Sequence, residues 1–197
     1  MHSLRIFHEY VDKNSGMRRM SNIRAEINSI DLIQEYCKTN SIQNLLDLPS
    51  TTYDKIVFNQ KMRVKKDDGT YLDYANFEDF NMRIAYQLEQ TFTARSGLVR
   101  SIIQKWTEAK KTFRYMNRVR FEHSVYPIFA DISIVQKSKL TTGSPMKFYT
   151  VQEAELFNNP ESYEIEMELD NTRIGIGTDY NDVKKIGDVI RKITRIV

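Results

Sequence analysis

The stretch ESYEIEMELDN, residues 161–171, alternates charged and apolar side chains with a period of two. An extended strand would place Glu164, Glu166 and Glu168 on one face, and Tyr163, Ile165, Met167 and Leu169 on the other. Carboxylates on one face of a strand lie about 7 Å apart, so they repel and raise each other's pKa. The three glutamates therefore need a compensating positive charge in the folded protein.

The composition indicates a single domain over residues 1–197. The chain is 41% hydrophobic and 28% charged, which is ordinary for a globular protein. Its net charge of +3 does not indicate a strongly basic nucleic-acid coat protein. Cys37 is the single cysteine, so no disulfide forms within the chain and a reducing compartment suits it. With no signal peptide and no apolar run near the roughly 18 residues of a membrane helix, we expect a cytoplasmic location.

Hydrophobic periodicity predicts more strands than helices. Leu4, Phe7 and Val11 favour a short helix at the start. Strands are predicted at 22–30, 80–92, 112–125, 128–139 and 162–170, with a hairpin at 53–74 that turns at residues 68–69. Further helices are predicted at 29–40, with Ser29 or Asp31 as N-cap, and at 96–111, with Ser96 as N-cap. A last helix is predicted to carry the stripe Val183, Ile186, Ile190 and Ile193.

Several of these strands carry charge along one whole face, sorted by sign. The face shared by Arg114, Arg118 and Arg120 is mainly basic. Arg83 shares a face with Glu89, and Asp131 shares one with Lys137. Each strand alone fits the solvent face of an antiparallel sheet.

Taken together, the sorted signs favour a closed barrel with a polar interior. A barrel of about eight strands can enclose one small ligand. Its acidic strand would hold a divalent cation such as Mg²⁺ or Mn²⁺, which prefers oxygen ligands, and its basic strands would hold an anion beside the cation. A shared metal would also relieve the repulsion among the three glutamates. The apolar face of the glutamate strand is then expected to lie between the barrel wall and surrounding helices.

These segments resemble a known family. ESYEIEMELDN is similar to the glutamate-rich strand of the triphosphate tunnel metalloenzymes. KTFRYMNRVRFEH and YPIFADISIVQKSK resemble paired strands of the RNA triphosphatase component of mRNA capping enzymes, and FNMRIAYQLE resembles a further strand of that family. The likeness is to the capping enzymes of giant DNA viruses and covers roughly residue 20 to the end.

The resemblance implies an α+β fold, an eight-stranded antiparallel β-barrel with surrounding helices, and removal of the γ-phosphate from the 5′-triphosphate end of RNA. It implies that the metal ligands are Glu26, Glu164, Glu166 and Glu168. It assigns phosphate contacts to Arg83, Arg114, Arg118, Arg120 and Lys137, and catalytic roles to Glu89, Arg118 and Asp131. The implied cofactor is Mg²⁺ or Mn²⁺. The implied partners are RNA and a guanylyltransferase module or subunit, in the cytoplasm, a virus factory or a virion.

The sequence departs from the family at three positions. Arg24 stands where the first glutamate strand should have its other carboxylate, Ala85 replaces a serine, and Phe129 replaces an arginine. Three explanations of Arg24 stay open: one metal ligand fewer, an inactive domain, or a true glutamate strand further upstream in a longer protein. Two other functions therefore stay open as well. One is hydrolysis of inorganic tripolyphosphate or polyphosphate, and the other is an inactive tunnel that binds RNA ends or a capping partner.

Overall fold

The computed structural model describes residues 1–49 and 55–194, apart from the side chains of residues 80, 193 and 194. Its contacts divide the chain into two compact units. Unit 1 consists of Met1, Met116–Val135 and Glu161–Val197, and unit 2 of His2–Tyr115 and Gln136–Pro160. No helix in the described ranges is long and apolar enough to cross a membrane.

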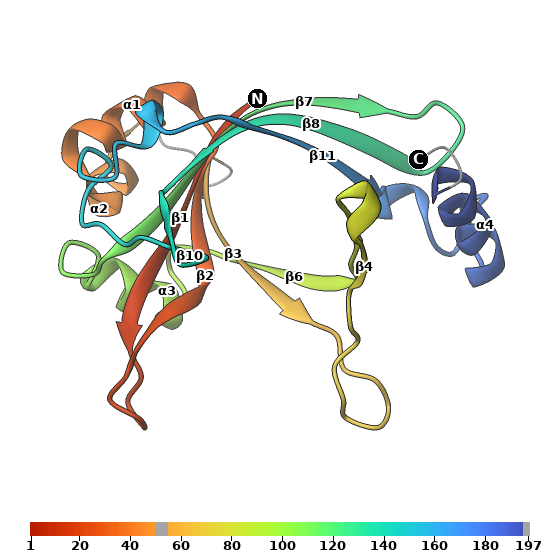
Figure 1. Cartoon of the computed structure of the whole chain (residues 1–197), viewed down its shortest axis with the longest axis horizontal. Coiled ribbons are helices and arrows are strands. Elements are labelled where there is room, and N and C mark those ends of the chain that lie inside the picture. The colour runs from red at the N-terminus through yellow and green to blue at the C-terminus, as the bar shows by residue number, and fades with distance from the viewer. Residues whose placement is uncertain (50–54, 195–197) are drawn as a thin grey trace. The chain divides into compact units, whose positions relative to one another are not determined.

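Seven strands form one antiparallel sheet in the order β11-β8-β7-β1-β2-β3-β6 (Figure 1). They are β1 (His2–Val11), β2 (Arg18–Ile27), β3 (Ile56–Arg63), β6 (Gln87–Phe92), β7 (Lys111–Glu122), β8 (Ile128–Lys137) and β11 (Ser162–Leu169). Two short pairs stand apart from it, β4 (Ala75–Phe77) with β5 (Met82–Ile84) and β9 (Leu140–Thr141) with β10 (Ser144–Pro145). The α+β class is confirmed, whereas closure into an eight-stranded barrel is not shown.

The helices are α1 (Ile30–Thr39), α2 (Ile42–Leu46), α3 (Gly97–Gln104) and α4 (Val183–Thr194). Ser96 begins α3 as expected, because its Oγ accepts a hydrogen bond from the backbone N–H of Val99 at 3.3 Å. Ser29 is the N-cap residue of α1 but makes no capping bond with its side chain. Helix α1 ends at Asn40, whose φ of 51° is left-handed, a common way for a helix to stop.

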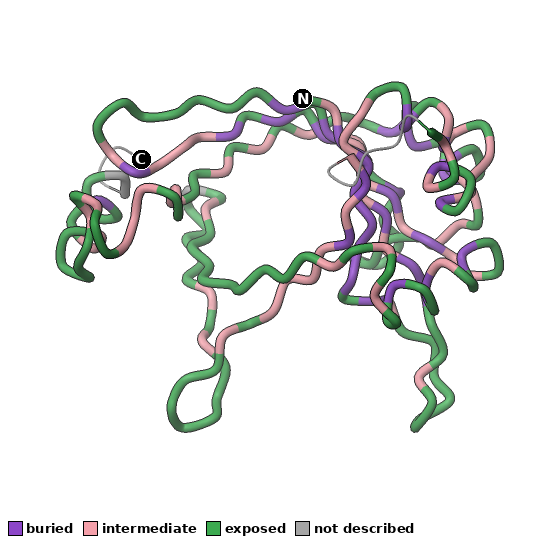
Figure 2. The backbone as a smooth tube through the Cα atoms, turned by 180° about the vertical axis from the view of Figure 1, so that it is seen from behind, coloured by how far each residue is buried: buried purple, intermediate pink, exposed green. Residues whose placement is uncertain are grey.

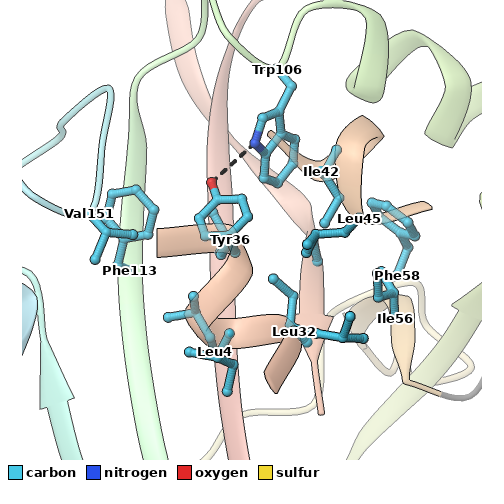
Figure 3. Close-up of a cluster of buried hydrophobic side chains, with 14 of the residues drawn as sticks. Leu4, Leu32, Tyr36, Ile42, Leu45, Ile56, Phe58, Trp106, Phe113 and Val151 are labelled. Atoms are coloured by element: carbon cyan, nitrogen blue, oxygen red, sulfur yellow. Dashed lines mark hydrogen bonds between the residues drawn. The ribbon is translucent and has the colours of Figure 1, made fainter. Parts of the chain in front are cut away.

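Unit 2 contains the hydrophobic core. Its buried side chains include Leu4, Ile6, Ile23, Ile27, Leu32, Tyr36, Leu45, Phe58, Trp106 and Phe113. The indole Nε1 of Trp106 donates a hydrogen bond to the Tyr36 hydroxyl at 3.1 Å (Figure 3). This bond satisfies two polar atoms that burial would otherwise leave without water.

Unit 1 is built differently, from the outer part of β7, most of β8, β11 and α4. Its strands bury polar side chains such as Arg118, Asp131 and Ser133 and leave apolar neighbours exposed. Arg173 contacts the turn between β7 and β8, donating hydrogen bonds to four backbone carbonyl oxygens of residues 123–126 at 2.7–3.2 Å. The turn is therefore held by the segment that follows β11.

The structure corrects four of the predicted elements. Residues 2–11 form a strand and not a helix, because Leu4, Ile6 and His8 are buried with a period of two against β2. The strand predicted at 80–92 is interrupted between β5 and β6. The predicted 53–74 hairpin forms only around its turn, where Gly69 has a φ of +82° and Lys65 pairs with Tyr71, whereas β3 pairs with β2 and β6; residues 53 and 54 lie outside the described residues. In α4 the buried side chain is Val189, while Val183 is exposed, and the Ile193 side chain is not described.

Candidate functional site

Each unit contains a cluster of charged side chains on one face of its strands. In unit 1, β11 pairs with β8 so that Glu166 lies beside Asp131 and Glu164 beside Ser133. Arg118 and Arg120 of β7 reach the same face, because both hydrogen-bond to Asp131. We call Arg118, Arg120, Asp131, Ser133 and the three β11 glutamates the unit 1 cluster.

Arg118 is at the centre of this cluster and is almost fully buried. Its Nη1 donates to Asp131 Oδ2 at 2.7 Å, its Nε donates to Ser133 Oγ at 3.0 Å, and its Nη2 donates to Glu166 Oε2. Asp131 itself has no exposed surface. A buried guanidinium needs acceptors for its N–H groups, and here three side chains of two neighbouring strands supply them.

Arg120 makes a two-pronged contact with the same aspartate. Its Nε and Nη2 donate to the two oxygens of Asp131 at 2.8 Å each. These hydrogen bonds raise the pKa of Arg120 above its ordinary value. The guanidinium also lies 3.6 Å from the ring centroid of Phe129. The phenylalanine that departs from the family pattern therefore supports an arginine of the cluster through a cation–π contact.

The glutamates of β11 are on the more covered face of their strand. Glu164 and Glu166 are partly buried, and Glu168 is exposed. The opposite face is open to solvent, with Tyr163 74% and Ile165 71% exposed. The expectation that Ile165 and Met167 are buried beneath helices is therefore wrong for the described chain, because no described element covers them.

The second cluster lies in unit 2 and surrounds Glu26. This carboxylate contacts Arg24 on its own strand and Arg5 of β1 at 3.5 Å. Arg24 also donates from Nη2 to Glu89 Oε1 at 2.8 Å. Burial alone would raise the pKa of Glu26, but the Arg5 and Arg24 guanidinium groups outweigh burial and hold it below its ordinary value. A carboxylate assigned to the metal is thus neutralised by two arginines.

The other residues assigned from the sequence are Arg83, Arg114 and Lys137. Arg83 is in β5, outside the large sheet, with its guanidinium 5.1 Å from the Tyr74 ring centroid. Arg114 is half-buried in β7, and Lys137 is exposed at the end of β8. Both belong to unit 2. Six assigned residues lie together within unit 1, and within unit 2 Arg24 connects Glu26 with Glu89.

Two further residues of these clusters were not predicted from the sequence. Arg5 faces Glu26 because its strand pairs with β2, with Arg5 opposite Glu26 in the register. Because a helix was predicted at the start of the chain, the sequence did not indicate that Arg5 faces Glu26, although Leu4 and Ile6 alternate with Arg5. Ser133 shares the face of Asp131 by parity alone, but only the Arg118 bond shows its role.

The carboxylates assigned to the metal, Glu26 and the three β11 glutamates, suit a hard cation only in part. Carboxylate oxygens are the ligands that Mg²⁺ and Mn²⁺ prefer, and β11 provides three of them at alternate positions. Among residues 1–49 and 55–194, however, no three or more His, Cys, Asp or Glu side chains are grouped as metal ligands. The carboxylates of Glu26 and Glu166 are already bonded to arginines.

Unit 2 also has an open hollow of about 670 Å³. Its lining includes Glu9, Arg18, Lys110, Lys147 and Tyr149. Glu9 accepts from Lys147 Nζ at 2.8 Å and from Arg18 Nη1 at 3.2 Å. Burial alone would raise the pKa of Glu9, but these two bonds outweigh it and lower the pKa. Lys110 instead has its Nζ 5.5 Å from the Tyr149 ring centroid, so the charged side chains of the lining are three cations and one carboxylate.

Comparison with known proteins does not place the chain in a family. No family model, no curated protein and no solved structure matches it.

Proposed function

We propose that the chain is a metal-dependent RNA 5′-triphosphatase domain, which removes the γ-phosphate of nascent RNA in the first step of cap formation. The observation that supports this is the unit 1 cluster, in which two arginines, an aspartate and alternating glutamates share one face of three neighbouring strands. The proposal includes the closed eight-stranded barrel and a guanylyltransferase partner, both taken from the family resemblance.

The residues of the cluster suit phosphoryl chemistry. A guanidinium can donate two parallel hydrogen bonds to phosphate oxygens, and Arg120 is reachable because 44% of its side chain is exposed. Asp131 accepts hydrogen bonds from both arginines and so orients them, and its bonds to Arg120 raise the pKa of that guanidinium. Glu164, Glu166 and Glu168 would hold Mg²⁺ or Mn²⁺, which when bound offsets charge on the transferring phosphoryl group.

The test is phosphate release by the purified chain from γ-labelled triphosphate RNA, with and without Mg²⁺ or Mn²⁺. We expect metal-dependent release of one phosphate per RNA end. Free tripolyphosphate is the parallel substrate. Faster release from tripolyphosphate than from RNA would favour the inorganic polyphosphatase, and no release from either would contradict both enzymatic functions.

Arg118→Lys is the sharpest single change in the proposed site. Lysine keeps the positive charge among Asp131 and Glu166 but loses the planar, two-pronged donor geometry. We expect turnover of triphosphate RNA to fall about tenfold or more, while the melting temperature stays close to that of the wild type. Arg118→Ala is expected to lower both turnover and melting temperature further, since it removes the guanidinium bonded to Glu166 and one of the two arginines bonded to Asp131.

The matched control for Arg118 is Arg100→Lys, on the exposed surface of α3. It should change neither turnover nor melting temperature. If Arg118→Lys retains full turnover, Arg118 does not contact phosphate and its role is structural.

The contacts of Arg24 favour a second candidate, an inactive tunnel domain that binds triphosphate ends of RNA without cleaving them. Arg24 is bonded both to Glu26, assigned to the metal, and to Glu89, assigned to orient water. If this candidate is right, the wild type binds triphosphate RNA with no phosphate release, and Arg24→Glu restores the Glu-x-Glu pattern and gains metal-dependent release. If Arg24→Glu does not fold, Arg24→Gln takes its place in the test, because glutamine removes the positive charge beside Glu26 without adding a negative one. Release by the wild type would contradict this candidate.

A further inference from the structure

Unit 1 exposes a wide apolar face. It is formed by Val119 and Phe121 of β7, Ile132 and Ile134 of β8, and Tyr163, Ile165 and Met167 of β11. We call these seven side chains the apolar face. Each is between 36% and 74% exposed. Antiparallel sheets usually turn their apolar side to the core, so this arrangement is the reverse of the common one.

Strand pairing makes the seven side chains one continuous surface. Ile165 pairs with Ile132 and Tyr163 with Ile134, so these four lie side by side. Strand β7 is the other neighbour of β8 (Figure 1). Arg118 and Arg120 point to the Asp131 side of the sheet, so the alternating residues Val119 and Phe121 point to the apolar side. The outer part of β7 is correspondingly exposed in Figure 2.

The exposed area is larger than a monomeric protein normally leaves uncovered. Side chains of this size bury about 200 Å² each when fully covered, so the observed exposures amount to roughly 750 Å². The largest apolar patch of a typical monomer is about 300–600 Å². A standard protein interface buries about 800 Å² on each partner. The apolar face therefore has the size of one side of a stable interface.

The character of the face favours a second copy of the same chain as its occupant. None of the seven positions carries a charge, so two copies can approach face to face without like-charge repulsion. A twofold interface requires this kind of self-complementarity, since the same patch is used on both subunits. Pairing of two β11 edges is disfavoured instead, because the antiparallel register would bring glutamates of the two copies opposite one another.

We propose that two copies of this chain pack their apolar faces against each other about a twofold axis. The contact leaves the charged face with Arg118 and the β11 glutamates free on the opposite side of each sheet. It is independent of the proposed catalytic activity, since it uses none of the residues of the unit 1 cluster.

The test is the mass of the purified 197-residue chain in solution, measured by sedimentation equilibrium from about 1 to about 100 μM, where weak interfaces of this size dissociate. The wild type is expected to show twice the 23.3 kDa mass of one chain. Ile132 is on the middle strand of the face, so Ile132→Lys would place two like charges in the dimer interface. We expect this variant to dimerise at least about tenfold more weakly.

Ile176→Lys is the matched control, because Ile176 is fully exposed and lies outside the apolar face. It should dimerise like the wild type. Ile165→Lys repeats the test if Ile132→Lys lowers the melting temperature. A mixture of Ile132→Lys with Ile132→Glu should recover dimers, because opposite charges then meet in the interface. The proposal would be overturned by a monomeric wild type, or by a dimer that Ile132→Lys and Ile165→Lys both leave intact. It would also be overturned if the mixture of Ile132→Lys and Ile132→Glu stays monomeric.

Discussion

At the scale of single residues, Arg24 and Arg118 show how a buried guanidinium defines its surroundings. Each is at most about 6% exposed and each bonds to two carboxylates. Removing an arginine from water is costly unless its donors find acceptors, so the carboxylates around it are recruited as partners. This explains why Glu26, Glu89, Asp131 and Glu166 are each bonded to an arginine.

His8 leads to a prediction about acid stability. It is buried and stacks near Trp106, with 6.4 Å between ring centroids. Burial, helped by the positive charge of Lys111, lowers its pKa from 6.5 to about 4. The unfolded chain therefore binds a proton more readily than the folded one, and stability is lost as the pH falls from about 6.5 towards about 4. The loss attributable to this residue is about 2–3 kcal/mol.

Urea unfolding followed at pH 5.0 to 7.0 measures this dependence. His8→Gln should flatten the slope in this range, while the exposed His123→Gln should keep it. Glu9 and Glu26 have lowered pKa values, so the stability they contribute is lost only as the pH falls below about 4.5. An unchanged slope in His8→Gln would mean that another group titrates in this window.

Among the helices, α1 and α3 both have a serine as N-cap residue, but the two serines differ in a testable way. Ser96 caps α3 through its side chain, whereas Ser29 at the start of α1 makes no such bond. Ser96→Ala should therefore lower the free energy of unfolding by about 1 kcal/mol, and Ser29→Ala by clearly less. Denaturant melts of the two variants measure the difference, and equal losses would show that the capping geometry does not decide it.

Element β11 illustrates that periodicity does not reveal which face of a strand is buried. Its alternation predicted the strand and the shared face of Glu164, Glu166 and Glu168, and both agree with the structure. The alternation is the same whichever face is covered. The register with β8, which places Glu166 beside Asp131, decided the neighbours of each face.

Across the whole molecule, the two units differ in the kinds of side chain that they bury. The hydrophobic core cluster lies entirely in unit 2, where α1, α2 and α3 supply Leu32, Leu45 and Ile102 to it. Unit 1 buries Met116, Val135 and Val189, but it also buries the charged Arg118 and Asp131 and exposes a wide apolar surface. A polar covered face is expected of a wall that holds a charged ligand, and an apolar open face of a surface that meets another protein chain. The proposed activity and the proposed dimer use these opposite faces.

Alternation in the sequence was enough to predict where most strands lie, which side chains share a face, and that Arg118, Asp131 and the β11 glutamates belong to polar faces. These follow from a period of two, which is local and needs no partner strand. Three features depend on the folded chain: residues 2–11 form a strand, Arg5 and Arg24 form ion pairs with Glu26, and Ile165 is exposed. The physical reason is that strand pairing and burial depend on residues far apart in the chain. An amphipathic segment is compatible with burial of either of its faces until the neighbouring elements are known.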